Sequence, residues 1–174
     1  MQRVVILGNA GSGKSTQAGA QRARQGFPVT HLDTLFWRPG WVEPDNEGFR
    51  ERVAASVAGE AWISEGNYIT RSFDLRLPKA DTIIVLNTPR LTCVRRVIWR
   101  TLFERRRADL AEGCSENILR GDFPEFLGFV WNFDRVTRPR IQAKLSTLLS
   151  GQRMIELRRP REVRALLDNL GEGT

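Results

Sequence analysis

The chain has few cysteines and no long apolar segment. Its two cysteines, Cys93 and Cys114, show neither a metal-type spacing nor a C-x-x-C pattern, which argues against a disulfide framework, a cysteine-built zinc site or a thioredoxin-like centre. No apolar run approaches the length of about 18 residues that a membrane helix needs, and no signal-peptide pattern precedes the first apolar run. We therefore expect a reduced, soluble protein of the cytoplasm.

Lysine and histidine are also scarce. The formal net charge of +7 is carried by 24 arginines and 3 lysines, and His31 is the single histidine. A lone histidine is more often a packing or hydrogen-bonding residue than a base, so His31 is not selected as catalytic. Arginine donates in planar pairs that match phosphate oxygens, although an arginine excess can also reflect codon bias.

One segment, Gly8–Ser15, carries a complete G-x-x-x-x-G-K-[ST] motif. The apolar run Val4–Leu7 precedes it, and helix-forming residues without proline follow it through Arg24, which is the strand–loop–helix context that the motif requires. The alternative, a glycine-rich turn that matches by chance, is disfavoured by this context. The predicted nucleotide-binding residues are Gly8, Asn9, Ala10, Gly11, Ser12, Gly13, Lys14, Ser15 and Thr16.

The motif predicts specific roles for its last three residues. Glycines let successive backbone N–H groups turn inward and form an anion site at a helix N-terminus. Lys14 reaches the β- and γ-phosphates, the Ser15 hydroxyl is a ligand of Mg²⁺, and Thr16 faces the α-phosphate. ATP and Mg²⁺ are therefore the expected cofactors.

Apolar strands and helix-forming segments alternate along the chain, which predicts an α/β fold with a parallel sheet covered by helices on both faces. The length of 174 residues fits a single domain, 1–174. Expected strands are Arg3–Leu7, Pro28–Leu32, Ala61–Glu65, Thr82–Asn87 and Arg153–Leu157. Expected helices are Lys14–Arg24, Asn46–Ala58, Arg90–Arg107, Glu125–Ser150 and Arg161–Leu170, with a loop at Gly113–Gly121.

Two carboxylates follow expected strands. Asp33 comes after the second strand and Glu65 ends the third, so both should lie at the carboxyl edge of the sheet, beside the γ-phosphate. One acid would orient or deprotonate a phosphoryl acceptor, and Glu65 would hold Mg²⁺ through water. The alternatives are that Asp33 caps a turn and that Glu65 is a solvated strand end.

Arginines cluster within thirteen residues of the expected helix Arg90–Arg107, and Arg96 and Arg100 share one helix face. Such a cluster can close over transferring phosphates as a lid, here about residues 95–125. A second group around Pro139 includes Arg138. The alternative for any one of these arginines is a solvated basic face. The predicted catalytic residues are Lys14, Asp33, Arg96, Arg100 and Arg138.

The segment after Asp33, about residues 33–60, is an expected acceptor-binding insert. Phe36, Trp37 and Trp41 could stack on a ring of the acceptor, with Arg38 holding an anionic group; alternatively, the tryptophans form a small core under the insert. Arg71 and Arg76 are further candidates for an acceptor phosphate, although either could pair with Asp74 instead. The predicted acceptor-binding residues are Asp33, Trp37, Arg38, Glu65, Gly66, Arg71 and Arg76.

Several segments together give the chain a family resemblance: Gly8–Thr16, His31-Leu32-Asp33, Pro39-Gly40-Trp41 and Glu65-Gly66-Asn67-Tyr68. With these, the chain resembles the adenylate-kinase-related proteins of the topology-modulation-protein-like family, within the P-loop nucleoside triphosphate hydrolase superfamily. The resemblance covers nearly the whole chain. It implies a three-layer α/β/α nucleotide-kinase-like fold with sheet order 2-3-1-4-5, the insert after Asp33 and an arginine-rich helical lid.

The expected function is that of an ATP-dependent kinase, which moves the γ-phosphoryl group to a small acceptor, most plausibly a nucleotide or a nucleoside. The alternative is a nucleic-acid-associated ATPase or a nucleotide-gated regulator of DNA topology, for which the basic surface would suit DNA. No helix-turn-helix, zinc-finger or RNA-recognition signature supports this alternative.

Overall fold

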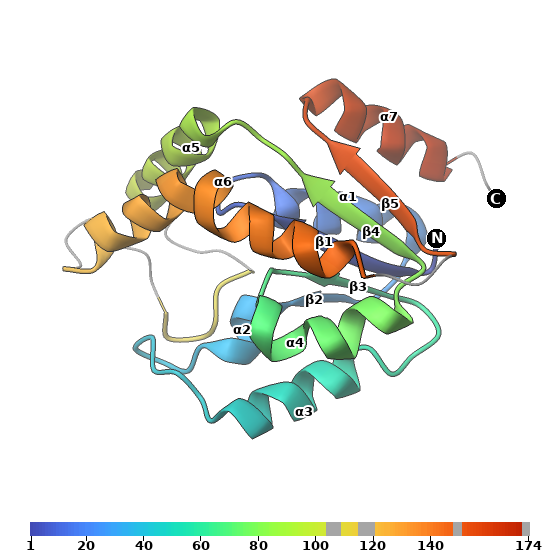
Figure 1. The fold of residues 1–174 in the computed structure, drawn as a ribbon, viewed down its shortest axis with the longest axis horizontal. Helices are drawn as coiled ribbons and strands as arrows, with labels where there is room; N and C mark the ends of the chain where they lie inside the picture. The colour runs from blue at the N-terminus through green and yellow to red at the C-terminus, as the bar shows by residue number, and fades with distance from the viewer. Residues whose placement is uncertain (104–108, 115–120, 148–150, 172–174) are drawn as a thin grey trace.

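Five parallel strands form the central sheet, in the order β2-β3-β1-β4-β5 (Figure 1). The computed structural model describes residues 1–103, 109–114, 121–147 and 151–171. The strands are β1 (Arg3–Gly8), β2 (Val29–His31), β3 (Trp62–Glu65), β4 (Thr82–Leu86) and β5 (Arg153–Leu157). The predicted α/β fold and its strand order are therefore confirmed.

Helices connect these strands and cover both faces of the sheet. They are α1 (Lys14–Gln25), α2 (Leu32–Phe36), α3 (Asn46–Ser56), α4 (Ile69–Arg76), α5 (Arg90–Phe103), α6 (Phe123–Leu145) and α7 (Pro160–Gly171), with a 3₁₀ turn at Leu77–Lys79. In Figure 1, α6 crosses in front of the sheet, and α3 and α4 lie side by side at the bottom of the view. Within the described ranges, no helix is both long and apolar enough to cross a bilayer.

Two cores sandwich the sheet, because successive side chains of a strand point to opposite faces. On one face, Val5 packs with Phe73 of α4 and Phe133 of α6. On the other face, Ile6 packs with Ala18 of α1. All three central strands are almost fully buried, and burial of one large apolar side chain contributes roughly 1.5–3 kcal/mol. The sheet is thus a rigid base for the loops at its carboxyl edge.

The structure corrects several of the helices and strands expected from the sequence. The expected strand Pro28–Leu32 ends at His31, because Leu32 begins α2 and buries with Phe36 against α3. Neither α2 nor α4 was expected, since both are too short to show a clear helical period. The expected helix Arg90–Arg107 is helical through Phe103, and residues 104–107 lie outside the described part. The expected helix Glu125–Ser150 begins at Phe123 and ends at Leu145.

Candidate active site

Residues 8–15 form a tight loop between β1 and α1, and its glycines are sterically required. Gly11 has φ 75°, and a Cβ there would lie 2.5 Å from the carbonyl oxygen of Cys93. Gly13, with φ 101°, is the N-cap of α1, which begins at Lys14. No acidic residue occupies the first turn of α1, so the positive end of the helix dipole faces the loop unopposed. This backbone suits a bound phosphate.

Three neighbouring elements hold the loop in place. The side chain of Asn67 accepts a hydrogen bond from Gly8 N at 3.1 Å and donates one to Gly8 O at 2.9 Å. Asn9 Nδ2 donates to the carbonyl of Val130 on α6 at 2.8 Å. Thr88 Oγ1 donates to the carbonyl of Ser12 at 3.0 Å. The loop is therefore fixed before any ligand arrives.

Two polar side chains of the loop are relevant to phosphate binding, Lys14 and Ser12. Lys14 Nζ donates to the carbonyl oxygen of Asn9 at 3.0 Å, so its ammonium lies over the loop. The Ser12 hydroxyl is buried and has no hydrogen-bond partner among the described residues. An orphaned buried hydroxyl costs free energy unless a ligand satisfies it, which fits a phosphate oxygen.

Two carboxylates meet at the Ser15 hydroxyl. Ser15 Oγ lies 3.1 Å from Glu65 Oε1, at the end of β3, and 2.6 Å from Asp109 Oδ2. Glu65 is 4% exposed, so it is not the solvated strand end of the alternative interpretation. Asp109 was not selected from the sequence, because it lies far from the other site residues along the chain and no motif marks it.

These oxygen donors suit a magnesium ion. Mg²⁺ prefers oxygen ligands and usually takes one or two carboxylates together with waters and substrate phosphates. Among the described residues, no group of three or more His, Cys, Asp and Glu side chains forms a metal cage. An ion at Ser15 would therefore need phosphate oxygens or waters to complete its coordination.

His31 lies at the same site. Its Nδ1 is 2.8 Å from Glu65 Oε1. Burial alone lowers the pKa of His31, but the hydrogen bond to Glu65 and the Glu65 charge raise it above its usual value. Burial raises the pKa of Glu65, but His31 and Lys14 lower it overall, so Glu65 is ionised at neutral pH. The expected hydrogen-bonding role of His31 fits this contact, although its place in the site was missed.

Asp33 lies on α2 rather than directly at a strand end. The N-cap of α2 is His31, and the Asp33 carboxylate instead accepts a hydrogen bond from the Tyr68 hydroxyl at 2.6 Å. Reduced hydration within the site raises the pKa of Asp33; the Tyr68 bond opposes this shift, whereas the Glu65 charge adds to it. Tyr68 has φ 41°, a strained value for a non-glycine residue, at the N-cap of α4.

A cleft with a volume of about 1440 Å³ extends from the loop. Its walls include His31, Asp109 and the predicted lid arginines Arg96 and Arg100. Arg96 Nη1 lies 3.4 Å from the carbonyl oxygens of Gly11 and Ser12, so this side chain reaches the loop. Arg138 is not part of this wall in the described part of the chain. It pairs with Asp134 one turn earlier on α6, at 2.8 Å.

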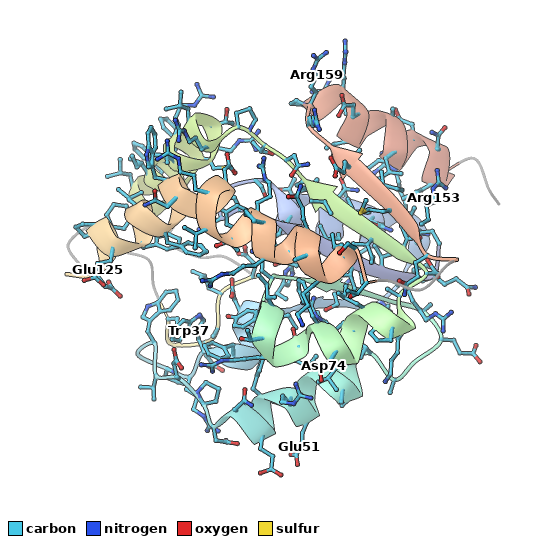
Figure 2. The ribbon with its side chains drawn as sticks, viewed as in Figure 1. Trp37, Glu51, Asp74, Glu125, Arg153 and Arg159 are labelled. Atoms are coloured by element: carbon cyan, nitrogen blue, oxygen red, sulfur yellow. The ribbon has the colours of Figure 1, made fainter. Side chains whose placement is uncertain are left out.

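Another wall of the cleft comes from Arg158 and Arg159, between β5 and α7, and from Pro160 at the start of α7. Figure 2 shows Arg159 at the start of α7, whereas Trp37 lies near α2, at the other edge of the sheet. Arg158 and Arg159 lie in no motif, so sequence reasoning missed them. Their position follows from the adjacency of β5 and β4.

Aromatic side chains gather on the acceptor side, as expected, but they pack mainly on one another. The rings of Trp37 and Phe36 are 4.9 Å apart, and those of Trp37 and Trp41 are 5.3 Å apart, both edge to face. Phe36 is buried against Phe49. Phe36 therefore lies in a small core under the insert, and Trp37 packs against this core with partial exposure.

The arginines of the acceptor side are engaged with acids. Arg71 pairs with Glu43 at 3.0 Å and stacks over the Phe36 ring, so it does not pair with Asp74. Asp74 is instead bound by Arg50 at 2.6 Å. Arg38 lies 3.9 Å from Asp45, a looser contact.

Arg76 does not contact an acceptor, contrary to the prediction. Its side chain is fully buried and donates to Ser64 Oγ, Ser72 Oγ and the carbonyl oxygens of Gly66 and Asn67, at 2.7–3.2 Å. Burial lowers the pKa of Arg76 to about 9. The guanidinium therefore holds the backbone of the turn after β3 from the protein interior. Gly66 within that turn packs against Leu32, which a Cβ would approach to 3.0 Å.

Comparisons with known proteins bear on the fold of the chain and on nothing further. No family model and no curated protein matches this chain. A shikimate kinase from Bacteroides thetaiotaomicron is similar over 98% of this chain and 97% of its own, with a TM-score of 0.58 and 16% identity. A shikimate kinase from Acinetobacter baumannii, solved with shikimate, is similar over 98% of this chain and 90% of its own, with a TM-score of 0.57 and 14% identity. A gluconokinase from Sinorhizobium meliloti is similar over 98% of this chain and 94% of its own, with a TM-score of 0.51 and 18% identity. The chain thus has the fold of these kinases.

Proposed function

We propose that this protein is an ATP- and Mg²⁺-dependent phosphotransferase that moves the γ-phosphoryl group to a hydroxyl of a small acceptor. One observation carries the proposal. A preformed phosphate loop and two carboxylates, Glu65 and Asp33, gather at the carboxyl edge of one sheet. Phosphoryl transfer is catalysed chiefly by positioning and by charge stabilisation, and these are the groups that it requires. The kinase names of the similarly folded structures agree with it.

The donor half of the site would be held by the loop. Its backbone amides and Lys14 bind the β- and γ-phosphates, and Thr16 faces the α-phosphate. Ser15 and, through water, Glu65 hold the Mg²⁺. When bound, the ion neutralises charge on the phosphates and fixes their orientation. The orphaned Ser12 hydroxyl supplies a further donor.

Asp33 would orient the acceptor hydroxyl and take its proton. A general base works best when its pKa approaches the working pH, and the pKa of Asp33 is raised in that direction. Tyr68 holds one carboxylate oxygen, which leaves the other for the acceptor. Arg96 and Arg100 stabilise the charge that spreads onto the transferred group. Arg138 could join them only by leaving Asp134.

The acceptor is proposed to be a nucleotide or a nucleoside, and the ion pairs favour the nucleoside. In the described insert and α4, Arg38, Arg50 and Arg71 each face a carboxylate, and Arg76 is buried. An acceptor phosphate held by Arg38, Arg50 or Arg71 would have to displace an acid. An uncharged ring needs only the exposed face of Trp37 and a hydroxyl near Asp33. We also propose, from its cysteine content, that the protein acts in the cytoplasm.

The test is ADP release from ATP–Mg²⁺ by the purified protein against a panel of nucleosides, nucleoside monophosphates and small polyols. We expect acceptor-dependent release that Lys14→Ala abolishes, with the phosphorylated product identified by mass spectrometry. Duplex DNA forms a separate arm. If DNA alone stimulates ADP release and no acceptor does, the kinase proposal is wrong and the DNA-associated ATPase takes its place.

A further inference from the structure

The segment 109–114 touches both halves of the site. At one end, Asp109 Oδ2 accepts the hydrogen bond from Ser15 Oγ at 2.6 Å. At the other end, Gly40 N donates to the carbonyl of Gly113 at 3.2 Å, and Cys114 Sγ donates to the carbonyl of Arg38 at 3.2 Å. The segment therefore links the phosphate loop to the acceptor-side insert.

The contact with the insert is close. Gly113 has φ 73°, and a Cβ at this position would lie 2.8 Å from the Cβ of Pro39. A larger residue would push the segment away from the insert, in addition to the strain of the left-handed backbone. The position of Asp109 is thus set by a fitted contact several residues away.

Two carboxylates lie within reach of the single hydroxyl of Ser15. A hydroxyl has one proton and can donate to only one carboxylate at a time, yet Glu65 and Asp109 both lie within hydrogen-bonding distance of Ser15 Oγ. The two negative charges repel, and the Asp109 charge raises the pKa of Glu65, Asp33 and His31 alike. Independently, Ser15 is the residue at which a phosphate loop of this type binds its metal. A divalent ion there would offset the repulsion.

We propose that Asp109 is an additional metal-binding residue, supplied by the segment that follows α5, and that it joins Ser15 and Glu65 when the metal–nucleotide complex binds. The inference rests on the proposed function. Because the same segment contacts Pro39 and Gly40, metal–nucleotide binding at the loop also holds the insert against the site. Donor binding thereby prepares the acceptor side.

The test measures metal binding directly. Mn²⁺ replaces Mg²⁺ as a probe, and its free concentration is followed by electron paramagnetic resonance in the presence of the protein and ADP. Asp109→Asn keeps the size and the hydrogen bond but removes the charge. We expect Mn²⁺ binding to the protein–ADP complex to weaken by about tenfold or more, with metal-free ADP affinity unchanged. Glu112→Gln, an exposed acid on the same segment, is the matched control and should bind Mn²⁺ as the wild type does.

Either of two results overturns the inference. Asp109→Asn could bind Mn²⁺ as tightly as the control, in which case Asp109 takes no part in metal binding. It could instead bind Mn²⁺ more tightly, which would make Asp109 an occupant that competes with the ion. Neither result concerns phosphotransfer. Failure of the wild type to phosphorylate any acceptor would overturn the proposed function while leaving an Asp109-dependent Mn²⁺ site in place.

Hydrogen exchange provides a second readout, one that a mere loss of affinity for nucleotide would not mimic. The Gly40 amide is bonded to Gly113 O. Saturating Mn²⁺–ADP should slow its exchange in the wild type and in Glu112→Gln. In Asp109→Asn at equal occupancy, we expect no slowing, and equal slowing would contradict the link between the metal and the insert.

Discussion

The two halves of the site are built differently. The donor half consists of backbone: glycines with positive φ, a helix N-terminus, and carbonyls held by Asn67, Asn9 and Thr88. The acceptor half consists of side chains on short helices, joined by ion pairs such as Arg71–Glu43 and Arg50–Asp74. Exposed ion pairs contribute little, typically 0–1 kcal/mol each. The donor half is therefore preformed, whereas the acceptor half can exchange partners at little cost.

This contrast has a functional meaning. A phosphate loop must present the same N–H donors to the phosphate oxygens in every cycle, so a rigid backbone suits it. A pocket for a variable acceptor can change by substitution of a few surface side chains without disturbing the sheet. We infer that the acceptor identity is encoded in the pairing of Arg38, Arg50 and Arg71, and not in the fold.

The largest effect is expected at the donor half. Lys14→Ala should lower phosphotransfer by about a thousandfold, because a positioned cation on the transferring phosphates is lost. The melting temperature should stay near that of the wild type, since the Lys14 ammonium makes one hydrogen bond within the described part of the chain, to Asn9 O. Lys144→Ala, at the exposed end of α6, is the control. Equal activity of the two variants would show that the loop does not carry the chemistry.

The next prediction concerns Arg76 and distinguishes a role in stability from a role in acceptor binding. Arg76→Ala would leave the carbonyls of Gly66 and Asn67 without their donor, inside the protein. We expect the free energy of unfolding in urea to fall by about 3 kcal/mol or more. Arg71→Ala, which loses a partly exposed ion pair and the stacking on Phe36, should lose less, about 1 kcal/mol. A raised acceptor KM with full stability in Arg76→Ala would restore the original prediction that Arg76 binds the acceptor.

Asp33→Asn tests whether the acceptor half shares the chemistry. We expect kcat to fall by about a hundredfold while ATP affinity is kept, because the base is removed. In the wild type, kcat should decline as pH falls through the raised pKa of Asp33, above the usual range of an aspartate, since the protonated acid cannot accept a proton. The variant should lose this acid limb of the pH profile. A lower melting temperature with unchanged kcat would instead make Asp33 structural.

The raised pKa of Asp33 also affects stability. The folded state holds the Asp33 proton more tightly than the unfolded chain does, so the free energy of unfolding falls as pH rises and Asp33 ionises. Asp33→Asn should consequently not destabilise the protein at neutral pH.

The smallest effect concerns the ion pairs. Glu43→Gln frees Arg71. We expect kcat/KM for monophosphate acceptors to rise by about threefold, with that for nucleosides unchanged. An equal change for both acceptors would break the inferred link between pairing and specificity.

Much of the fold could be predicted from the sequence because its signals are local. The run Val4–Leu7 and the glycine motif are contiguous, and β5 was placed with its observed bounds, Arg153–Leu157. The short helices α2 and α4 were missed, since one or two turns show no reliable period and the apolar Leu32 directly follows β2. Their formation depends on tertiary packing against Phe49.

The site was less predictable for the same physical reason. Glu65 and Asp33 follow strands, and the rule of the carboxyl edge brings them near the loop. Asp109, by contrast, lies 94 positions from Ser15, and its contact exists only once the segment 109–114 meets the insert. Arg76 resembled a ligand by its charge, and only its burial revealed a support role.

The central claim is that the phosphate loop and Asp33 serve one reaction. The most direct measurement is a single-turnover experiment with ATP labelled in its γ-phosphoryl group, in the presence of the acceptor that stimulates ADP release best. The account predicts that the label appears in the phosphorylated acceptor, and that Lys14→Ala and Asp33→Asn each prevent this transfer. Label found only in inorganic phosphate, at the same rate in the wild type and Asp33→Asn, would contradict it.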